Sequence, residues 1–85
     1  MGRTMIRVLF PNPADSPSGR SPLKLSYGLT RDDAGQVSPE LRYSHGSRQL
    51  TRETWQAWRA CGATIEADAR GQSIVRQVLG LDAMP

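Results

Sequence analysis

The stretch LKLSYGLTRDDAGQVSPELRY, residues 23–43, decides the fold, because it holds two alternating segments separated by a turn. In residues 23–30 every second side chain is apolar, which is typical of a strand with one buried face. Residues 32–35 supply Asp, Asp and Gly, which favour a tight turn, and residues 37–43 resume the alternation. Pro39 lacks a backbone donor, so the second strand is expected to lie at a sheet edge or to start late. The stretch therefore predicts a β-hairpin.

The chain before the hairpin divides into a short strand and a long loop. Residues 5–10 are apolar except for Arg7 and are stopped by Pro11, which predicts a strand covered on one face and partly on the other. Residues 11–22 contain four of the six prolines, together with serines and a glycine. Four prolines prevent a regular hydrogen-bonded ladder, so this segment is expected to be a flexible Pro/Ser-rich loop.

The clearest helix start in the chain is Thr51, whose hydroxyl can accept a hydrogen bond from an orphan amide of the first turn. Leu50 and Trp55 stand on either side of it at the spacing of a hydrophobic staple. Trp55 and Trp58 begin an apolar stripe that continues to Cys61. The pattern predicts a helix that packs both tryptophans on the sheet and buries Cys61 as a small hydrophobe.

The end of this helix is marked less sharply than its start. Gly62 is suited to cap it, but the apolar stripe extends to Ala69 and favours the longer helix. Residues 73–80 then form an apolar face of their own, with Ser73 and Gly80 suited to begin and end a second short helix. The β-branched residues in this segment leave a last strand as the competing interpretation.

These elements predict an α+β fold for the 85 residues, which are expected to form a single domain, 1–85. The sheet is expected to be small and antiparallel, with about three strands, packed by the Trp-bearing helix and a short C-terminal helix. No apolar run approaches the roughly 20 residues of a membrane span, and the N-terminal strand is too short for a signal peptide. With one cysteine and no internal disulfide, the protein is expected to be cytoplasmic and not membrane-bound.

The residue types that carry enzyme chemistry are scarce in this chain. There is one histidine and one cysteine, whereas a zinc site takes roughly four ligands, and no nucleophile-elbow motif is present. We therefore expect no catalytic residue, no metal and no cofactor. His45 beside Gly46 is typical of a turn. A small ribonuclease that uses His45, Tyr43 and Arg48 is the least favoured of the functions considered.

The basic residues are unevenly distributed and are almost all arginine. The chain has eleven basic and eight acidic residues, a net charge of +3, and Lys24 is its only lysine. The first 52 residues carry a net +4 and the remaining 33 a net −1, so positive charge concentrates near the hairpin end and the helix start. Arginine presents a planar fork that pairs with phosphate or carboxylate, although a GC-rich genome produces the same bias.

The densest basic and aromatic cluster in the sequence lies between residues 42 and 59. Arg52 and Arg59 share the outer face of the predicted helix, at a spacing suited to two carboxylates or to successive phosphates. A solvated helix face over a tryptophan-anchored core explains the same arginines without any ligand. The candidate binding residues are Arg42, Tyr43, His45, Arg48, Arg52 and Arg59.

We expect this cluster to make the chain a small non-enzymatic regulatory or inhibitory module, of the kind that a phage or other mobile element encodes. Arg, Tyr and Trp dominate protein-binding hot spots, so the expected partner is a protein with an acidic surface. The chain itself is expected to be a monomer or a weak homodimer. The alternative is a nucleic-acid-binding module that places the same arginines on phosphates.

Overall fold

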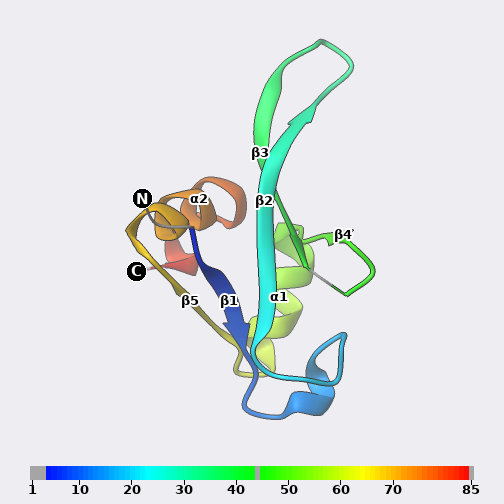
Figure 1. The fold of residues 1–85 in the computed structure, drawn as a ribbon, viewed down its shortest axis with the longest axis vertical. Helices are drawn as coiled ribbons and strands as arrows, with labels where there is room; N and C mark the ends of the chain where they lie inside the picture. The colour runs from blue at the N-terminus through cyan, green and yellow to red at the C-terminus, as the bar shows by residue number, and fades with distance from the viewer. Residues whose placement is uncertain (1–3, 44, 85) are drawn as a thin grey trace.

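The chain forms a five-stranded antiparallel sheet with two helices on one of its faces (Figure 1). This computed structural model describes residues 4–43 and 45–84. The predicted α+β class and antiparallel sheet are confirmed, but the sheet has five strands, in the order β4-β3-β2-β1-β5, and not about three. The elements are β1 (Ile6–Leu9), β2 (Leu23–Arg31), β3 (Val37–Tyr43), β4 (Arg48–Gln49), α1 (Arg52–Ala60), β5 (Thr64–Ala67) and α2 (Ala69–Leu79), with 3-10 turns η1 (Pro13–Asp15) and η2 (Leu81–Ala83).

The predicted hairpin is present, and its distal half projects from the rest of the molecule (Figure 1). The backbone N–H of Asp32 donates to the carbonyl of Gln36 at 3.0 Å, and Gly35 takes a φ of +80°, as its place in the turn requires. β1 pairs with β2 only at residues 23–25, and β4 pairs with β3 only at residues 42–43. The hairpin is therefore two-stranded over residues 26–40, which we call the arm.

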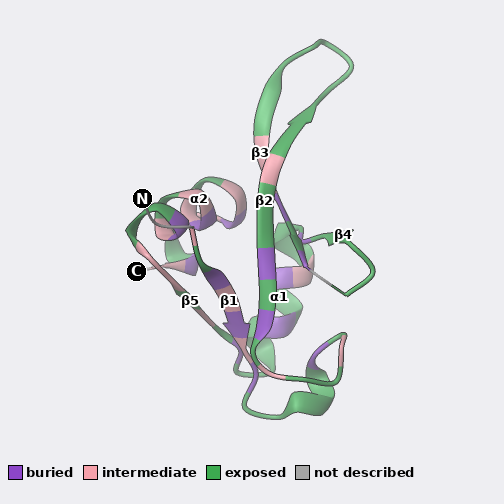
Figure 2. Ribbon diagram, viewed as in Figure 1, coloured by how far each residue is buried: buried purple, intermediate pink, exposed green. Residues whose placement is uncertain are grey.

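The core lies between the sheet and the helices, where alternate strand residues face inward (Figure 2). Trp58 belongs to this core, with its ring edge-to-face to Phe10 and to Tyr43 at centroid distances of 5.3 Å. The prediction that both tryptophans anchor the helix to the sheet is confirmed, since Trp55 and Trp58 are buried. The outer face of the sheet is polar and carries the ion pairs Arg7–Glu66 and Arg42–Glu40.

The predicted continuation of the first helix to Ala69 is wrong. α1 ends at Ala60, and Gly62 adopts a φ of +87°, while the carbonyl of Trp58 accepts the amides of Cys61 and Ala63. This left-handed glycine turns the chain back so that β5 pairs with β1 at the sheet edge. Cys61 falls on the helix end and is exposed, which corrects its predicted burial.

The second helix is present, as predicted, but it begins earlier than Ser73. α2 has Asp68 as its N-cap, whose Oδ1 accepts the amide of Gly71 at 2.7 Å, while Oδ2 accepts the amide of Met5 at 3.0 Å. The helix ends at Leu79 before Gly80, so the competing interpretation of a last strand is wrong. No helix in the described residues is long and apolar enough to cross a bilayer.

Candidate binding site

Two of the six predicted binding residues, Arg52 and Arg59, hold the helices together. The Nε of Arg52 donates to the carbonyl of Val78 at 3.2 Å, and Nη1 of Arg59 lies 2.9 Å from Oδ2 of Asp82. The hydrogen bond from Arg59 lowers the pKa of Asp82 below its ordinary 3.8, because it stabilises the charged carboxylate. Both arginines are exposed, as the helical pattern predicts, but their guanidinium groups are already engaged.

Arg42 and Tyr43 are neighbours in β3 and therefore point to opposite faces of the sheet. Tyr43 is buried against Trp58 in the core. Arg42 lies on the outer face, where its Nε donates to Oε1 of Glu40 at 3.0 Å and its Nη1 to the carbonyl of Ser47 at 2.7 Å. Arg42 thus positions the turn between β3 and β4.

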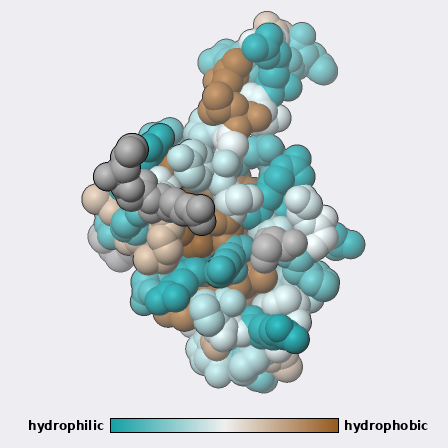
Figure 3. All heavy atoms as spheres, viewed as in Figure 1, coloured by the Kyte–Doolittle hydropathy of each residue, from teal (hydrophilic) through white to brown (hydrophobic). Residues whose placement is uncertain are grey.

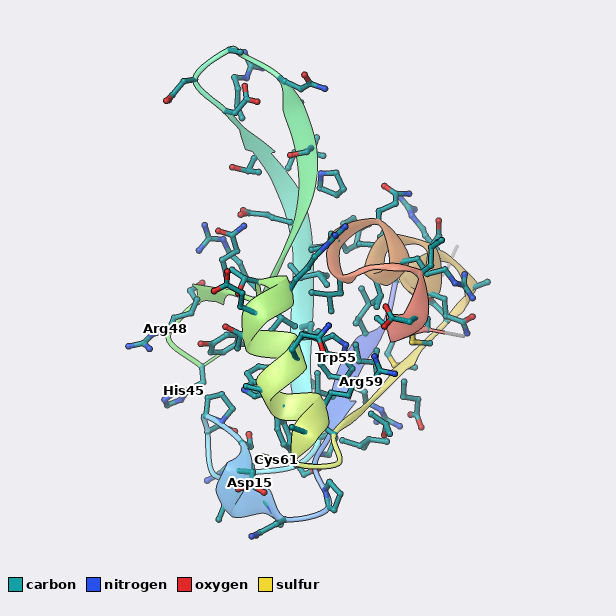
Figure 4. The ribbon with its side chains drawn as sticks, turned by 180° about the vertical axis from the view of Figure 1, so that it is seen from behind. Asp15, His45, Arg48, Trp55, Arg59 and Cys61 are labelled. Atoms are coloured by element: carbon teal, nitrogen blue, oxygen red, sulfur yellow. The ribbon has the colours of Figure 1, made fainter. Side chains whose placement is uncertain are left out.

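His45 and Arg48 lie at that turn, where the structure brings them close to a distant part of the chain (Figure 4). Two hollows, of about 520 Å³ and 370 Å³, adjoin at His45, which lines both. We call these two hollows together the basic groove, because four cationic or titratable basic side chains line it. The lining residues are Ser18, Arg20, Pro22, Leu23, Lys24 and His45 in the first hollow, and Pro17, Tyr43, His45, Gly46 and Arg48 in the second.

The segment 11–22 builds one wall of the basic groove through local hydrogen bonds. Ser16 is buried, and its Oγ accepts the amide of Ser18 at 3.3 Å, while its carbonyl accepts the amide of Gly19 at 2.9 Å. Ser21 Oγ accepts the amide of Phe10 at 2.9 Å and so ties the segment to the end of β1. These hydrogen bonds help to position Arg20 beside the groove. The predicted flexibility of the segment stays a prediction.

The charge of the basic groove is not neutralised by neighbouring acids. In the part of the chain that the structure describes, no aspartate or glutamate lines either hollow, and this includes Asp15 on η1 of the same segment. Among the described residues, the ion pairs within 4.0 Å do not include Arg20, Lys24 or Arg48. Exposed guanidinium and ammonium groups in such a hollow are available to a carboxylate or a phosphate, and guanidinium groups bind either one in a bidentate manner.

Arg20 and Lys24 line the candidate site but were missed by sequence reasoning. Lys24 is the first outward-facing residue of β2, and Arg20 precedes the strand in a segment interpreted only as a loop. Both are far from His45 in the sequence and reach it only because the hairpin folds back. The one signal that could have found them is the presence of two basic residues within a few positions of Pro22.

Within residues 4–43 and 45–84, no group of three or more His, Cys, Asp or Glu side chains is placed to hold a metal ion. Comparison with protein-family models, curated proteins and solved structures finds no match for this chain. What the groove can bind is therefore inferred from its own shape and charge.

Proposed function

We propose that this protein is a non-enzymatic interaction module that binds an acidic segment of a partner protein in its basic groove. The observation that carries the proposal is the convergence of Arg20, Lys24, His45 and Arg48 on two adjoining hollows that no acid lines. Charge-assisted hydrogen bonds from such groups contribute about 1.5–3 kcal/mol each when they form. Occupation of the partner's acidic segment would give the module a regulatory or inhibitory role.

The walls of the groove favour a peptide with apolar as well as acidic side chains. Pro17, Pro22 and Leu23 line the hollows beside the basic groups. An extended peptide alternates its side chains, so it can place carboxylates on the arginines and an apolar side chain against the prolines. A hydrogen bond anchors each side of the groove to a neighbouring part of the chain, which favours a smaller loss of entropy on binding.

A protein partner is better supported than a nucleic acid by the positions of the aromatic rings. Single-stranded nucleic acids stack their bases on exposed aromatic side chains. Trp55, Trp58 and Tyr43 are all buried, and Tyr27, on the arm, has the guanidinium of Arg70 over its ring at 5.7 Å. Of the tyrosine and tryptophan rings, Tyr43 lines the groove, but it is only 7% exposed and offers little surface for stacking beside the cations.

The experiment compares two probes by fluorescence anisotropy: a labelled peptide of alternating glutamate and leucine, and a labelled thymidine oligonucleotide. We expect the peptide to bind, and Arg20→Ala and Arg48→Ala each to weaken its binding about ten-fold, the equivalent of 1.4 kcal/mol. Arg31→Ala is the matched control, because it removes the same charge at the far end of the arm.

Two results would overturn the proposal. One is tight oligonucleotide binding that falls steeply with salt while the peptide binds weakly, which would support the nucleic-acid function. The other is an equal loss of peptide binding in Arg31→Ala and Arg48→Ala, which would show that net charge alone attracts the probe.

A further inference from the structure

The arm presents an apolar surface that the helices leave uncovered. Tyr27, Leu29 and Val37 are 42%, 74% and 45% exposed, although they lie on the sheet face that is buried lower down (Figure 2). Figure 3 shows apolar residues gathered on the arm. A two-stranded hairpin with an open apolar face is marginally stable by itself, so the arm is suited to packing against another chain.

The two edges of the arm differ in what they offer to another strand. The backbone hydrogen bond from Asp32 to Gln36 marks these two residues as a hydrogen-bonded pair of the β2–β3 ladder. Hydrogen-bonded and non-hydrogen-bonded pairs alternate along an antiparallel ladder, so Pro39 belongs to a non-hydrogen-bonded pair and its backbone points away from β2. The same alternation points the carbonyl of Leu41 outward, where it accepts the amide of Leu50 at 2.7 Å. Pro39 has no amide hydrogen, so the outer edge of β3 lacks a donor at this position.

The outer edge of β2, which faces away from β3, carries the backbone groups that the β2–β3 ladder does not use. Tyr27, Leu29 and Arg31 each direct a backbone N–H and C=O away from β3. Among the described residues, β1 is the strand on this side of β2, and its pairing stops at Leu25. Over the residues that the structure describes, these three successive outward positions have no partner strand, which is the arrangement from which β-augmentation begins.

We propose that two copies of this chain form a dimer by antiparallel pairing of their β2 edges around Leu29. This register places Leu29 opposite Leu29 of the second copy, and Tyr27 opposite Arg31 of the second copy. The two arms then form one four-stranded sheet with a continuous apolar face.

The charges along the arm identify a second copy as the occupant. The tip carries Asp32 and Asp33, whereas Arg70 lies over Tyr27 at the base. In a two-fold antiparallel pair, the acidic tip of each arm passes the base of the other, so the acids approach Arg70 of the second copy. Such an interface is closed and self-complementary, which limits the assembly to a dimer.

The dimer goes beyond the proposed binding function and adds to it. The segments that line the basic groove, within residues 17–24 and 43–48, lie away from the arm tip (Figure 1), so dimerisation through the arms should leave both grooves accessible. A dimer with two grooves would bind a partner that has two acidic segments with higher avidity than a single copy does.

Sedimentation equilibrium of the full chain tests this interface through two lysine substitutions on one strand. Leu29→Lys places a charge at the centre of the interface, and we expect it to weaken dimerisation at least ten-fold. Thr30→Lys is the matched control, because Thr30 points to the other face, opposite Gly28 of the second copy, and we expect the dimer to persist. Leu29 is exposed in the single chain, so Leu29→Lys should retain the circular dichroism spectrum of the wild type.

Thiol cross-linking tests the register independently of affinity. In a Cys61→Ser background, Leu29→Cys should give a cross-linked dimer, because paired residues across antiparallel strands have Cα atoms about 5.5 Å apart. Val37→Cys, exposed on the same face but on β3, should not cross-link. A wild type that stays monomeric at millimolar concentration, or a dimer insensitive to Leu29→Lys, would overturn the proposal. Neither result bears on peptide binding in the groove.

Discussion

Arg59 on α1 and Asp82 on η2 form an ion pair, with 2.9 Å between Nη1 and Oδ2. Arg52, earlier on the same helix, bonds to the carbonyl of Val78 at 3.2 Å. The two arginines on the outer face of α1 therefore fix the second helix and the turn that follows it. Because their guanidinium groups have partners, the candidate binding surface moves from α1 to the basic groove.

Arg59→Ala should raise the pKa of Asp82 toward its ordinary value of 3.8. The hydrogen bond from Arg59 is the largest cause of the lowered pKa, so its removal takes away most of the preference for the charged form. A ¹³C carboxyl NMR titration measures the change directly. Arg31→Ala is the control and should leave the titration of Asp82 unaltered, whereas an unmoved Asp82 in Arg59→Ala would contradict the pairing.

The Arg59–Asp82 ion pair makes the stability of the fold depend on pH, and the lowered pKa of Asp82 sets the direction of this dependence. The pKa of Asp82 is lower in the folded chain than in the unfolded chain, so the pair stabilises the fold above about pH 3.8, the ordinary value. This contribution is lost as the pH falls through the folded pKa. The difference in urea midpoint between wild type and Arg59→Ala should shrink on acidification, and a difference that grows would contradict this sign.

Trp58→Ala should lower the free energy of unfolding by about 3–5 kcal/mol, because it removes a large buried side chain from the core. The ring of Trp58 contacts both Phe10 and Tyr43 edge-to-face and is only 8% exposed. Urea unfolding followed by circular dichroism measures the loss. Gln56→Ala, exposed on the same helix, should change stability by no more than about 0.5 kcal/mol.

Gly71→Ala should destabilise the fold, although alanine is the better helix former. A Cβ at this position would lie 2.8 Å from the carbonyl oxygen of Met5 and 2.8 Å from Cγ1 of Ile6, and backbone cannot move aside cheaply. We expect a loss of about 1–3 kcal/mol. Gly28→Ala is the matched control, since nothing lies within 4 Å of its added carbon, and equal thermal midpoints for the two variants would contradict the close contact.

Asp68 should be replaceable by asparagine but not by alanine. Its Oδ1 caps α2 at Gly71, and its Oδ2 accepts the amide of Met5 before β1. Asp68→Ala should cost about 0.5–2 kcal/mol, the usual effect of a lost N-cap. Asp68→Asn keeps an acceptor for Gly71, so its urea midpoint should lie between those of alanine and wild type. An asparagine variant as unstable as alanine would refute the capping role.

The parts of the fold that could be predicted from sequence are those specified by local chemistry. The hairpin alternates regularly and contains its own turn residues, so the second strand was predicted with its observed bounds, residues 37–43. β5 was missed because its partner, β1, is far away in the chain. Ile65 also continues the apolar stripe of α1, so the sequence pattern favours a longer helix at this position. The short strand β5 forms there because it pairs with β1.

The candidate site was predictable in part for the same reason. His45 and Arg48 belong to a local cluster of basic residues, and the structure places both in the basic groove. Arg20 and Lys24 reach the groove only through the folding of distant segments. The partners of Arg52 and Arg59 lie beyond residue 77, so a helical pattern cannot show that these side chains are engaged.

The central claim is that the basic groove is the binding surface, and an NMR titration tests it most directly. ¹⁵N-labelled protein is titrated with the unlabelled peptide of alternating glutamate and leucine, and amide shifts are followed residue by residue. The account predicts that the shifts concentrate at Arg20, Lys24, His45 and Arg48. Shifts concentrated on α1 or on the arm, with these four residues unmoved, would contradict it.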